Sequence, residues 1–322
     1  MPISHYLWAG LDFMFDEQYQ PVLLDVNRSS HMLWEYLKFR GNERPFELAA
    51  AAMESRDGPV CLLWRRSDPP FEGTMAHGET APFIGHYLAR HLHVPPHVCF
   101  VEDNQTERDV LTAASGESIV PASVFRWWYQ IPWSYERAGA LVVNPNSVWV
   151  TVRDKHRCYE ALAGATTFRV PETFRVETLA DVEAIVAQRP ALFARGYVLK
   201  PRVGWGGQGV HVVPPGARAD IPLLPPRYLL SERIVPPERA SRRYWDARVF
   251  VMNGEYCGGL MYANDDFVTN YHRGGVAEPL PADLSDRLQA PAIEAVARID
   301  AAAAAVAALP APPVSDLVNV VY

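Results

Sequence analysis

The segment KPRVGWGGQGV, residues 200–210, decides how the rest of the chain is interpreted. Lys200 follows the apolar residues YVL, so we expect it to end a strand. The glycines after it permit a tight loop whose backbone N–H groups can face phosphate oxygens, and the lysine adds a positive charge for the same phosphates. An ordinary glycine-rich hairpin is the alternative, and no GK[ST] follows, so this is not a Walker loop. The predicted phosphate-binding residues are Lys200, Gly204, Gly206, Gly207, Gln208 and Gly209.

Three further motifs follow this loop in order. SERI places an acid, Glu232, at the end of an apolar strand. DARVFV sets Asp246 and Arg248 two residues apart and therefore on one face of a strand, although such a pair alone is more often a surface ion pair than a site. In TNYHRGG, residues 269–275, Asn270 and Arg273 precede two glycines whose N–H groups can approach a developing oxyanion.

In this order, KPx4GGQG, SERI, DARVFV and TNYHRGG resemble the ATP-grasp superfamily. Within it, they are most similar to glutathione synthetases and to ligases that add glutamate to ribosomal protein or amino acids to peptides. LVVNPNSVWVTVRDKHRCYEAL, residues 141–162, resembles the family's Asn-Pro turn and lysine-bearing helix, and it maps a second phosphate-facing lysine onto Lys155. The resemblance covers roughly residues 140–308. It implies an α/β (α+β) fold whose two lobes grip ATP, with the adenine side contacted by Glu232, Arg233 and Ile234.

The resemblance also implies a magnesium site, but its usual segment does not follow the long C-terminal helix. ATP-grasp chains continue there with a strand bearing Asp, a hairpin and a strand ending Glu-x-Asn. Here AGLDFMFDEQYQPVLLDVN, residues 9–27, carries Asp12 and Asp25 on the two arms of a predicted hairpin. Asn27 follows Asp25 by two residues, which puts both oxygen ligands on one strand face. We therefore expect a circular permutation, with magnesium on Asp12, Asp25 and Asn27. Permutation is tolerated when chain ends lie close together.

Several positions depart from the family pattern. Asp25 is shorter than the usual Glu, so the metal must lie nearer the strand. Asp316 is a rival to Asp12 for the first metal position. Val268 stands where an Arg often precedes the TNxxRGG element, which weakens the expected contacts to the acyl phosphate. A chance DVN sequence in a surface hairpin is the alternative to the metal site.

The order of apolar and polar runs predicts three α/β units. Residues 1–57 are expected to be the transposed C-terminal part of the ATP-grasp domain, with a hairpin and a helical stretch. Residues 58–145, where strands such as 59–64 and 97–102 flank a helix at 84–92, are expected to form a small open domain that precedes the grasp. Residues 146–322 then form the ATP-grasp lobes, with helices at 151–164, 179–189 and about 285–308.

The resemblance implies an ADP-forming ligase that makes an amide bond through an acyl phosphate, as in peptide biosynthesis. Arg248, Arg273 and Asn270 would hold the acyl group, and the N–H groups of Gly274 and Gly275 would stabilise the oxyanion. The expected partners are ATP, Mg²⁺ and a small-molecule carboxylate and amine, with an amino acid or peptide as the expected acid. Two alternatives are a non-catalytic ATP-binding regulatory module and an ATP-grasp enzyme with a non-amine acceptor.

Composition excludes other function classes. The formal net charge is −7 and no run of Lys and Arg occurs, so we expect no nucleic-acid partner. Four cysteines without CxxC spacing favour reduced thiols, and the first residues lack the basic region of a signal peptide. The longest apolar run, around 301–309, is too short to span a bilayer. A cytoplasmic protein is therefore expected, and a homodimer is left open.

Overall fold

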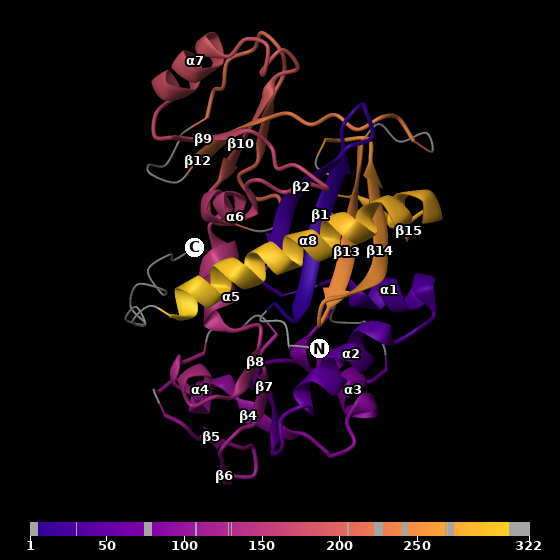
Figure 1. The fold of residues 1–322 in the computed structure, drawn as a ribbon, viewed down its shortest axis with the longest axis vertical. Helices are drawn as coiled ribbons and strands as arrows, with labels where there is room; N and C mark the ends of the chain where they lie inside the picture. Colours follow the sequence, from indigo (N-terminus) through magenta and orange to yellow (C-terminus); the bar gives the residue numbers. More distant parts are fainter. Residues whose placement is uncertain are drawn as a thin grey trace.

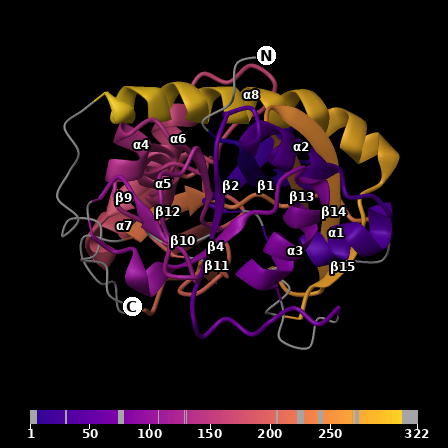
Figure 2. The ribbon, with the colours of Figure 1, turned by 90° about the horizontal axis from the view of Figure 1, so that it is seen from below.

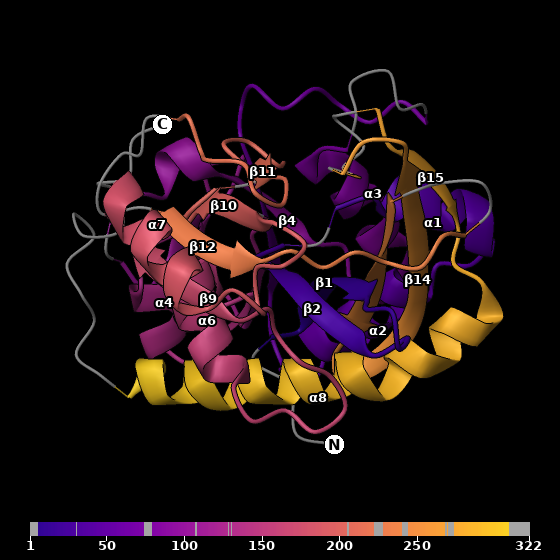
Figure 3. The same ribbon diagram turned by 90° about the horizontal axis from the view of Figure 1, so that it is seen from above.

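The computed structural model describes residues 6–29, 31–73, 79–106, 108–127, 129, 131–204, 206–221, 228–239, 244–267, 269 and 274–308. These residues form two antiparallel sheets, one parallel sheet and a two-stranded ribbon, so the predicted α/β class is confirmed. Figure 1 shows the parallel sheet below the two antiparallel ones. Figure 3 shows β1 (Trp8–Phe15) and β2 (Pro21–Asn27) as the strands of the larger antiparallel sheet that lie nearest the smaller one.

The larger antiparallel sheet has five strands and is built from both ends of the chain. Its order is β15 (Val276–Pro279), β14 (Glu255–Asn264), β13 (Tyr244–Met252), β1 (Trp8–Phe15) and β2 (Pro21–Asn27). The hairpin expected near the N-terminus therefore forms and pairs with β13, in a register that sets Asp12 opposite both Arg248 and Asp25. Arg248 lies 236 positions from Asp12 along the chain, so this register joins distant segments.

Every residue of β1 is buried because the strand is covered on both faces. Helix α8 (Ala282–Ala307) runs across one face of the sheet, as Figures 1 and 2 show. Its buried side chains recur at helical spacing, among them Leu284, Leu288 and Ala292, and they pack with Leu11 and Phe13 of β1. Since side chains alternate along a strand, Asp12 points to the other face. The side of the sheet away from α8 is therefore where polar groups gather.

The smaller antiparallel sheet carries the glycine-rich loop. Its order is β11 (His211–Val213), β10 (Tyr197–Pro201), β12 (Tyr228–Glu232) and β9 (Thr173–Val176), and helix α7 (Leu179–Gln188) contributes to its core. A capping box between Thr178 and Asp181 begins α7, close to the predicted position.

The helix expected over 151–164 is instead two helices, α5 (Asn146–Arg153) and α6 (Lys155–Leu162). Asp154 lies between them with an extended ψ of 112° and accepts a hydrogen bond from the backbone N of His156. Because Asp is a good N-cap residue, it ends one helix and begins the next. The break makes Lys155 the first residue of α6.

The third sheet is parallel and follows the order β4 (His97–Phe100), β3 (Val60–Trp64), β7 (Ser123–Phe125) and β8 (Leu141–Val143). It packs with α2 (Arg44–Met53) and α3 (Ala81–His91) in one apolar core. The side-chain amide of Asn144 joins this unit to the hairpin by bonding Trp8 N, Trp8 O and Arg28 O at 2.8–2.9 Å. The remaining elements are α1 (Leu33–Arg40), η1 (Val101–Asp103), β5 (Leu111–Thr112), β6 (Ser118–Ile119) and α4 (Ser134–Arg137). Within the described residues, no helix is both long and apolar enough to cross a bilayer.

Candidate functional site

The face of the five-stranded sheet opposite α8 carries a buried ion pair. Arg248 on β13 donates from Nε and Nη2 to the two carboxylate oxygens of Asp12 on β1, at 2.7 and 2.8 Å. Asn27 on β2 donates to the same carboxylate at 3.3 Å. Burial disfavours the charge on Arg248, but the Asp12 carboxylate outweighs it and raises the pKa of the guanidinium above its ordinary value. This bidentate pair fixes both side chains at the centre of the sheet.

Replacing Arg248 by methionine is expected to lower the free energy of unfolding by about 3–5 kcal/mol, because it leaves Asp12 buried and without its cation. The double variant Asp12→Asn/Arg248→Met should recover part of that loss. Arg44→Met is the matched control, since the Arg44 side chain is 46% exposed in its pair with Glu255 and should cost at most about 1 kcal/mol. Urea unfolding would check this, and equal losses in Arg248→Met and Arg44→Met would contradict it.

Two lysines from the other lobe reach the same region. Lys155 Nζ lies 2.7 Å from both carboxylate oxygens of Asp25, so the start of α6 is tied to β2. Lys200 Nζ, at the end of β10, donates to the hydroxyl of Tyr159 at 2.6 Å. That hydroxyl in turn donates to the carbonyl oxygen of Leu24 at 2.5 Å. The structure thus brings together Lys155, Lys200, Asp25, Asp12 and Arg248.

Tyr159 is part of this arrangement and was not among the residues expected from sequence. It follows Lys155 by four residues, so both lie on one face of α6. That spacing is the signal that could have identified it. Its ring also lies 4.9 Å from Lys200 Nζ, which places an aromatic face beside the ammonium group.

Lys200 is a buried cation that forms no ion pair with any carboxylate in the described part of the chain. The residue is 9% exposed. Burial lowers the pKa of its ammonium to about 7, and the neighbouring charge of Lys155 lowers it further than Asp25 raises it. A bound polyphosphate would supply a negative charge beside this ammonium group.

We expect ATP binding to weaken as the pH rises above 7, because binding must then return a proton to Lys200. Below that pH the free protein already carries the proton and no such cost arises. With the pKa of Lys200 near 7, affinity for a non-hydrolysable ATP analogue should fall up to about tenfold per pH unit. Calorimetry in two buffers of different ionisation heat would show the proton uptake. A slope that persists in Lys200→Met would contradict this assignment.

The glycine-rich loop adopts backbone conformations that favour glycine. Gly206, Gly207 and Gly209 have φ of 63°, 71° and 67°. A Cβ at Gly209 would also lie 2.8 Å from Cγ of Pro201, too close for a real contact. The loop begins beside α6, since Lys155 N donates to Arg202 O at 2.9 Å. Gly204 is half-buried in the same loop, and Gln208 is exposed.

A small apolar cluster lies where the two lobes meet. It consists of Met14, Val22 and Ile234, with Leu24 packed against it. Of the three residues expected on the adenine side, only Ile234 joins this cluster. The Glu232 carboxylate instead pairs with Arg169 at 2.5 Å, and Arg233 donates to the Tyr244 hydroxyl at 2.9 Å. The sequence did not indicate a binding role for Met14, Val22 and Leu24, because apolar residues in a hairpin usually belong to the hydrophobic core.

The TNYHRGG element is described only in part. Val268, Asn270, Arg273 and the rival metal ligand Asp316 lie outside the described residues. Gly274 is exposed with a φ of 86°, and Gly275 is buried. Thr269 is hydrogen-bonded to the side chain of Asp246, so this element begins beside β13.

The hairpin residues offer a donor set that suits a magnesium ion. Asp12 and Asp25 face each other across β1 and β2, and the Asn27 amide adjoins Asp12. Mg²⁺ is usually held by one or two carboxylates together with water and substrate phosphates. The chemistry of these residues therefore fits the ion. Both carboxylates are meanwhile paired with cations, Asp12 with Arg248 and Asp25 with Lys155.

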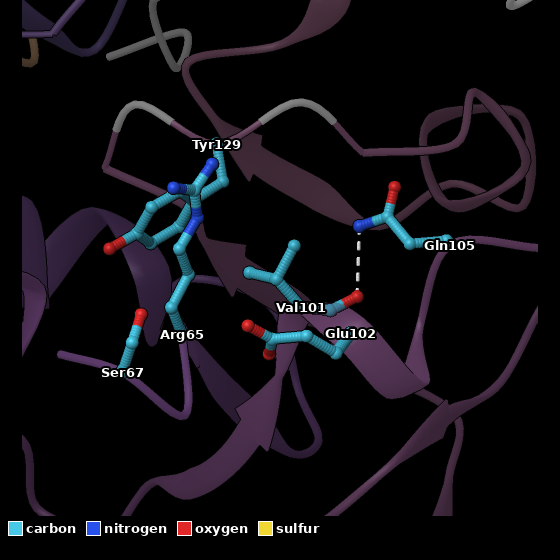
Figure 4. Close-up of a pocket in the computed structure, with 6 residues that line it drawn as sticks. All are labelled: Arg65, Ser67, Val101, Glu102, Gln105 and Tyr129. Atoms are coloured by element: carbon cyan, nitrogen blue, oxygen red, sulfur yellow. Dashed lines mark hydrogen bonds between the residues drawn. The ribbon is translucent and has the colours of Figure 1, made fainter.

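A separate hollow of about 410 Å³ lies at the carboxyl ends of the parallel strands. Figure 4 shows Arg65 lying over the ring of Tyr129, with a centroid distance of 5.0 Å. The other lining residues are Ser67, Val101, Glu102 and Gln105. Most of these are exposed, and none belongs to the constellation of lysines and carboxylates.

Comparison with known proteins agrees with this fold. A family model described as the RimK-like ATP-grasp domain matches residues 152–313. A crystal structure titled putative gamma-glutamylcysteine synthetase from Methylobacillus flagellatus KT is 12% identical, with a TM-score of 0.51, and the match covers 95% of this chain and 90% of that one. At that identity the likeness concerns the fold alone.

A second solved structure, the D-cycloserine synthetase DcsG, is 17% identical with a TM-score of 0.44, and the match covers 79% of this chain and 84% of that one. No curated protein matches the sequence. The family match spans half of the chain and confirms the predicted ATP-dependent ligase at the level of the family. The chain belongs to the RimK-like ATP-grasp family.

Proposed function

We propose that this protein joins a carboxylate to an amine through an acyl phosphate and releases ADP and phosphate. One observation supports this most: two lysines, two carboxylates and an arginine from distant segments converge between the lobes. That set can neutralise a triphosphate on one side and hold an anionic acyl group on the other. A regulatory module would need the ATP-binding part but not Arg248 beside the carboxylates.

ATP would bind with its adenine on the apolar cluster of Met14, Val22, Leu24 and Ile234. Its phosphates would meet Lys155, Lys200 and the N–H groups of the 204–209 loop. Lys155 then exchanges the Asp25 carboxylate for phosphate oxygens, which frees Asp25 for metal binding. Magnesium, held by Asp12, Asp25 and Asn27, would supply charge neutralisation at the phosphates.

The substrate carboxylate attacks the γ-phosphorus, and the bond from that phosphorus to the β-phosphate oxygen breaks. Such a transfer depends on positioning and charge stabilisation more than on covalent help from the protein. Arg248 and Arg273, with Asn270, would hold the acyl group. The amine then attacks the acyl carbon, the Gly274 and Gly275 N–H groups stabilise the oxyanion, and phosphate leaves as the amine loses a proton.

We assign residues 58–145 to the domain that precedes the grasp and residues 146–322 to its lobes. Residues 1–57 would complete the second lobe through circular permutation. The family match covers residues 152–313 and so falls within the lobes of this division. We infer a cytoplasmic protein, since all four cysteines are free and buried.

The acid is proposed to be an amino acid or peptide, because Arg248 and Arg273 suit a carboxylate. The test incubates the purified protein with ATP, magnesium, hydroxylamine and pooled small acids. Acid-dependent ADP together with hydroxamate is the expected result. AMP and pyrophosphate would instead mean adenylation, and ADP without hydroxamate would favour an acceptor other than an amine.

A further inference from the structure

Asp246 on β13 and Tyr262 on β14 stand directly opposite each other beside Arg248. The Asp246–Tyr262 pair lies on the face that carries Asp12, because Asp246 and Arg248 are two residues apart on one strand. Arg248 Cζ is 5.7 Å from the centre of the Tyr262 ring. The pair thus adjoins the position proposed for the acyl group, on the side away from Lys155 and Lys200.

Both members of the pair carry a buried polar atom without a hydrogen-bond partner. Tyr262 is 4% exposed, and its hydroxyl is unpaired within the described chain. Asp246 is half-buried as a residue and bonds Thr269, yet its Oδ1 is inaccessible and also unpaired. A buried polar atom without a partner is unfavourable and is rarely left in that state without a reason. Two such atoms on paired residues beside the proposed position of the acyl group indicate that a ligand completes them.

The charged groups around the pair indicate whether that ligand is a cation or an anion. Arg248 is paired with Asp12, and within the described ranges Asp246 forms no ion pair of its own, although Arg248 acts on it electrostatically. A further carboxylate, Glu79, acts electrostatically on both Tyr262 and Arg248. Its oxygens accept hydrogen bonds from the backbone N of Met32 and Trp34 at 2.7 and 2.6 Å, which hold it at the start of α1.

Asp246 and Glu79 both have raised pKa values, because the negative charge of each is poorly stabilised where it is buried. Burial raises the pKa of Asp246 to about 7, and the nearby charge of Asp12 adds to the effect. Burial likewise raises the pKa of Glu79 to about 7, although the α1 backbone N–H groups and Arg248 oppose it. A bound cation would favour the ionised form of both carboxylates, whereas a further carboxylate beside them would favour their protonated form.

An ammonium group fits this place better than a metal ion. It donates three hydrogen bonds, and the unpaired oxygens of Asp246 and Tyr262 can accept two of them. A magnesium ion takes carboxylates together with water and phosphate oxygens, whereas one of the two unpaired atoms here is a phenol hydroxyl.

We propose that the Asp246–Tyr262 pair binds the protonated amino group of the amine cosubstrate, with Glu79 adding negative potential. The inference rests on the proposed ligase function and specifies its second substrate as a primary amine recognised in its cationic form. It also gives Asp246 and Tyr262 a role in specificity rather than in phosphoryl transfer.

Equilibrium dialysis tests this without turnover. The full chain, with a non-hydrolysable ATP analogue and magnesium, is exposed to labelled glycinamide and, separately, to N-acetylglycinamide, which lacks the ammonium charge. Glycinamide should bind at least about tenfold more tightly than the acetylated probe. Asp246→Asn and Tyr262→Phe should remove that preference. Tyr256→Phe is the matched control, because Tyr256 lies on the same strand but bonds Ser285 of α8.

Equal binding of the two probes by the wild type, including no binding of either, would overturn the proposal. So would a preference that survives in both Asp246→Asn and Tyr262→Phe. Circular dichroism establishes that each variant is folded, and the use of two variants guards against one failing to fold. A protein that makes no hydroxamate but still prefers glycinamide would refute the ligase function and leave this cation site standing.

Discussion

Lys200→Met is expected to reduce turnover by about 100- to 1000-fold without loss of stability. No described carboxylate pairs with this lysine, and burial lowers its pKa to about 7, so its positive charge is unfavourable in the free protein. Methionine keeps the apolar stem and removes the cation that burial disfavours. The free energy of unfolding should therefore stay the same or rise, while the charge that meets the phosphates is lost.

The measurement combines urea unfolding with ADP release in the hydroxylamine assay. Lys38→Met is the control, since that lysine is 52% exposed and pairs with Glu35 on its own helix. It should keep full activity and change stability by at most about 0.5 kcal/mol. Turnover at the wild-type rate in Lys200→Met would rule out the phosphate role. A large loss of stability would show instead that Lys200 is structural.

Asp25→Ala should be as inactive as Lys200→Met, for a different reason. Asp25 is the proposed metal ligand and also the partner of Lys155, so its loss removes an oxygen donor and frees a cation in the same place. Because the Asp25 side chain is 34% exposed, the protein should remain folded. The loss of activity should not be recovered by raising the magnesium concentration.

Much of this site could be predicted from sequence because its residues lie at the ends of strands or at alternate positions on one face of a strand. The apolar strand before Lys200 indicated the position of this lysine. In the sequence DVN, Asp25 and Asn27 are two residues apart, and side chains two apart on a strand share a face. The pairing of β1 with β13 could be expected only through the family resemblance. No local pattern indicates which strand a hairpin will join.

Other features depend on three-dimensional contacts that leave no local trace. Glu79 lies in a loop before α3, and its relation to Arg248 arises only when α1 packs beside β14 and β15. The pairing of Asp246 with Tyr262 depends on the register of β13 and β14. The break at Asp154 follows from a capping side chain that also pairs with Arg202, and this pairing requires the glycine-rich loop to pack against α6.

Deleting residues 1–29 should prevent folding, whereas moving residues 1–57 to the other end of the chain should not. β1 is an interior strand of its sheet, paired with β13 and β2, and the deletion removes its buried Leu11, Phe13 and Phe15 from the core beneath α8. Each of these side chains contributes about 1.5–3 kcal/mol, and the loss also leaves β13 with an unpaired edge. That sum approaches the whole stability of an ordinary domain.

The relocated chain begins at residue 58, joins the natural ends through residues 309–322 and 1–5, and finishes at residue 57. The geometry favours this because Tyr6 N donates to Asp300 of α8 at 2.5 Å, so the start of the hairpin lies against the last helix. If the hairpin completes the sheet whatever its place in the chain, the relocated protein should fold and retain magnesium-dependent turnover. Circular dichroism and ADP release measure both properties.

A deletion variant that still folds and turns over ATP would refute the role given to the hairpin. An unfolded relocated chain would show that the present connectivity, and not the sheet alone, is required.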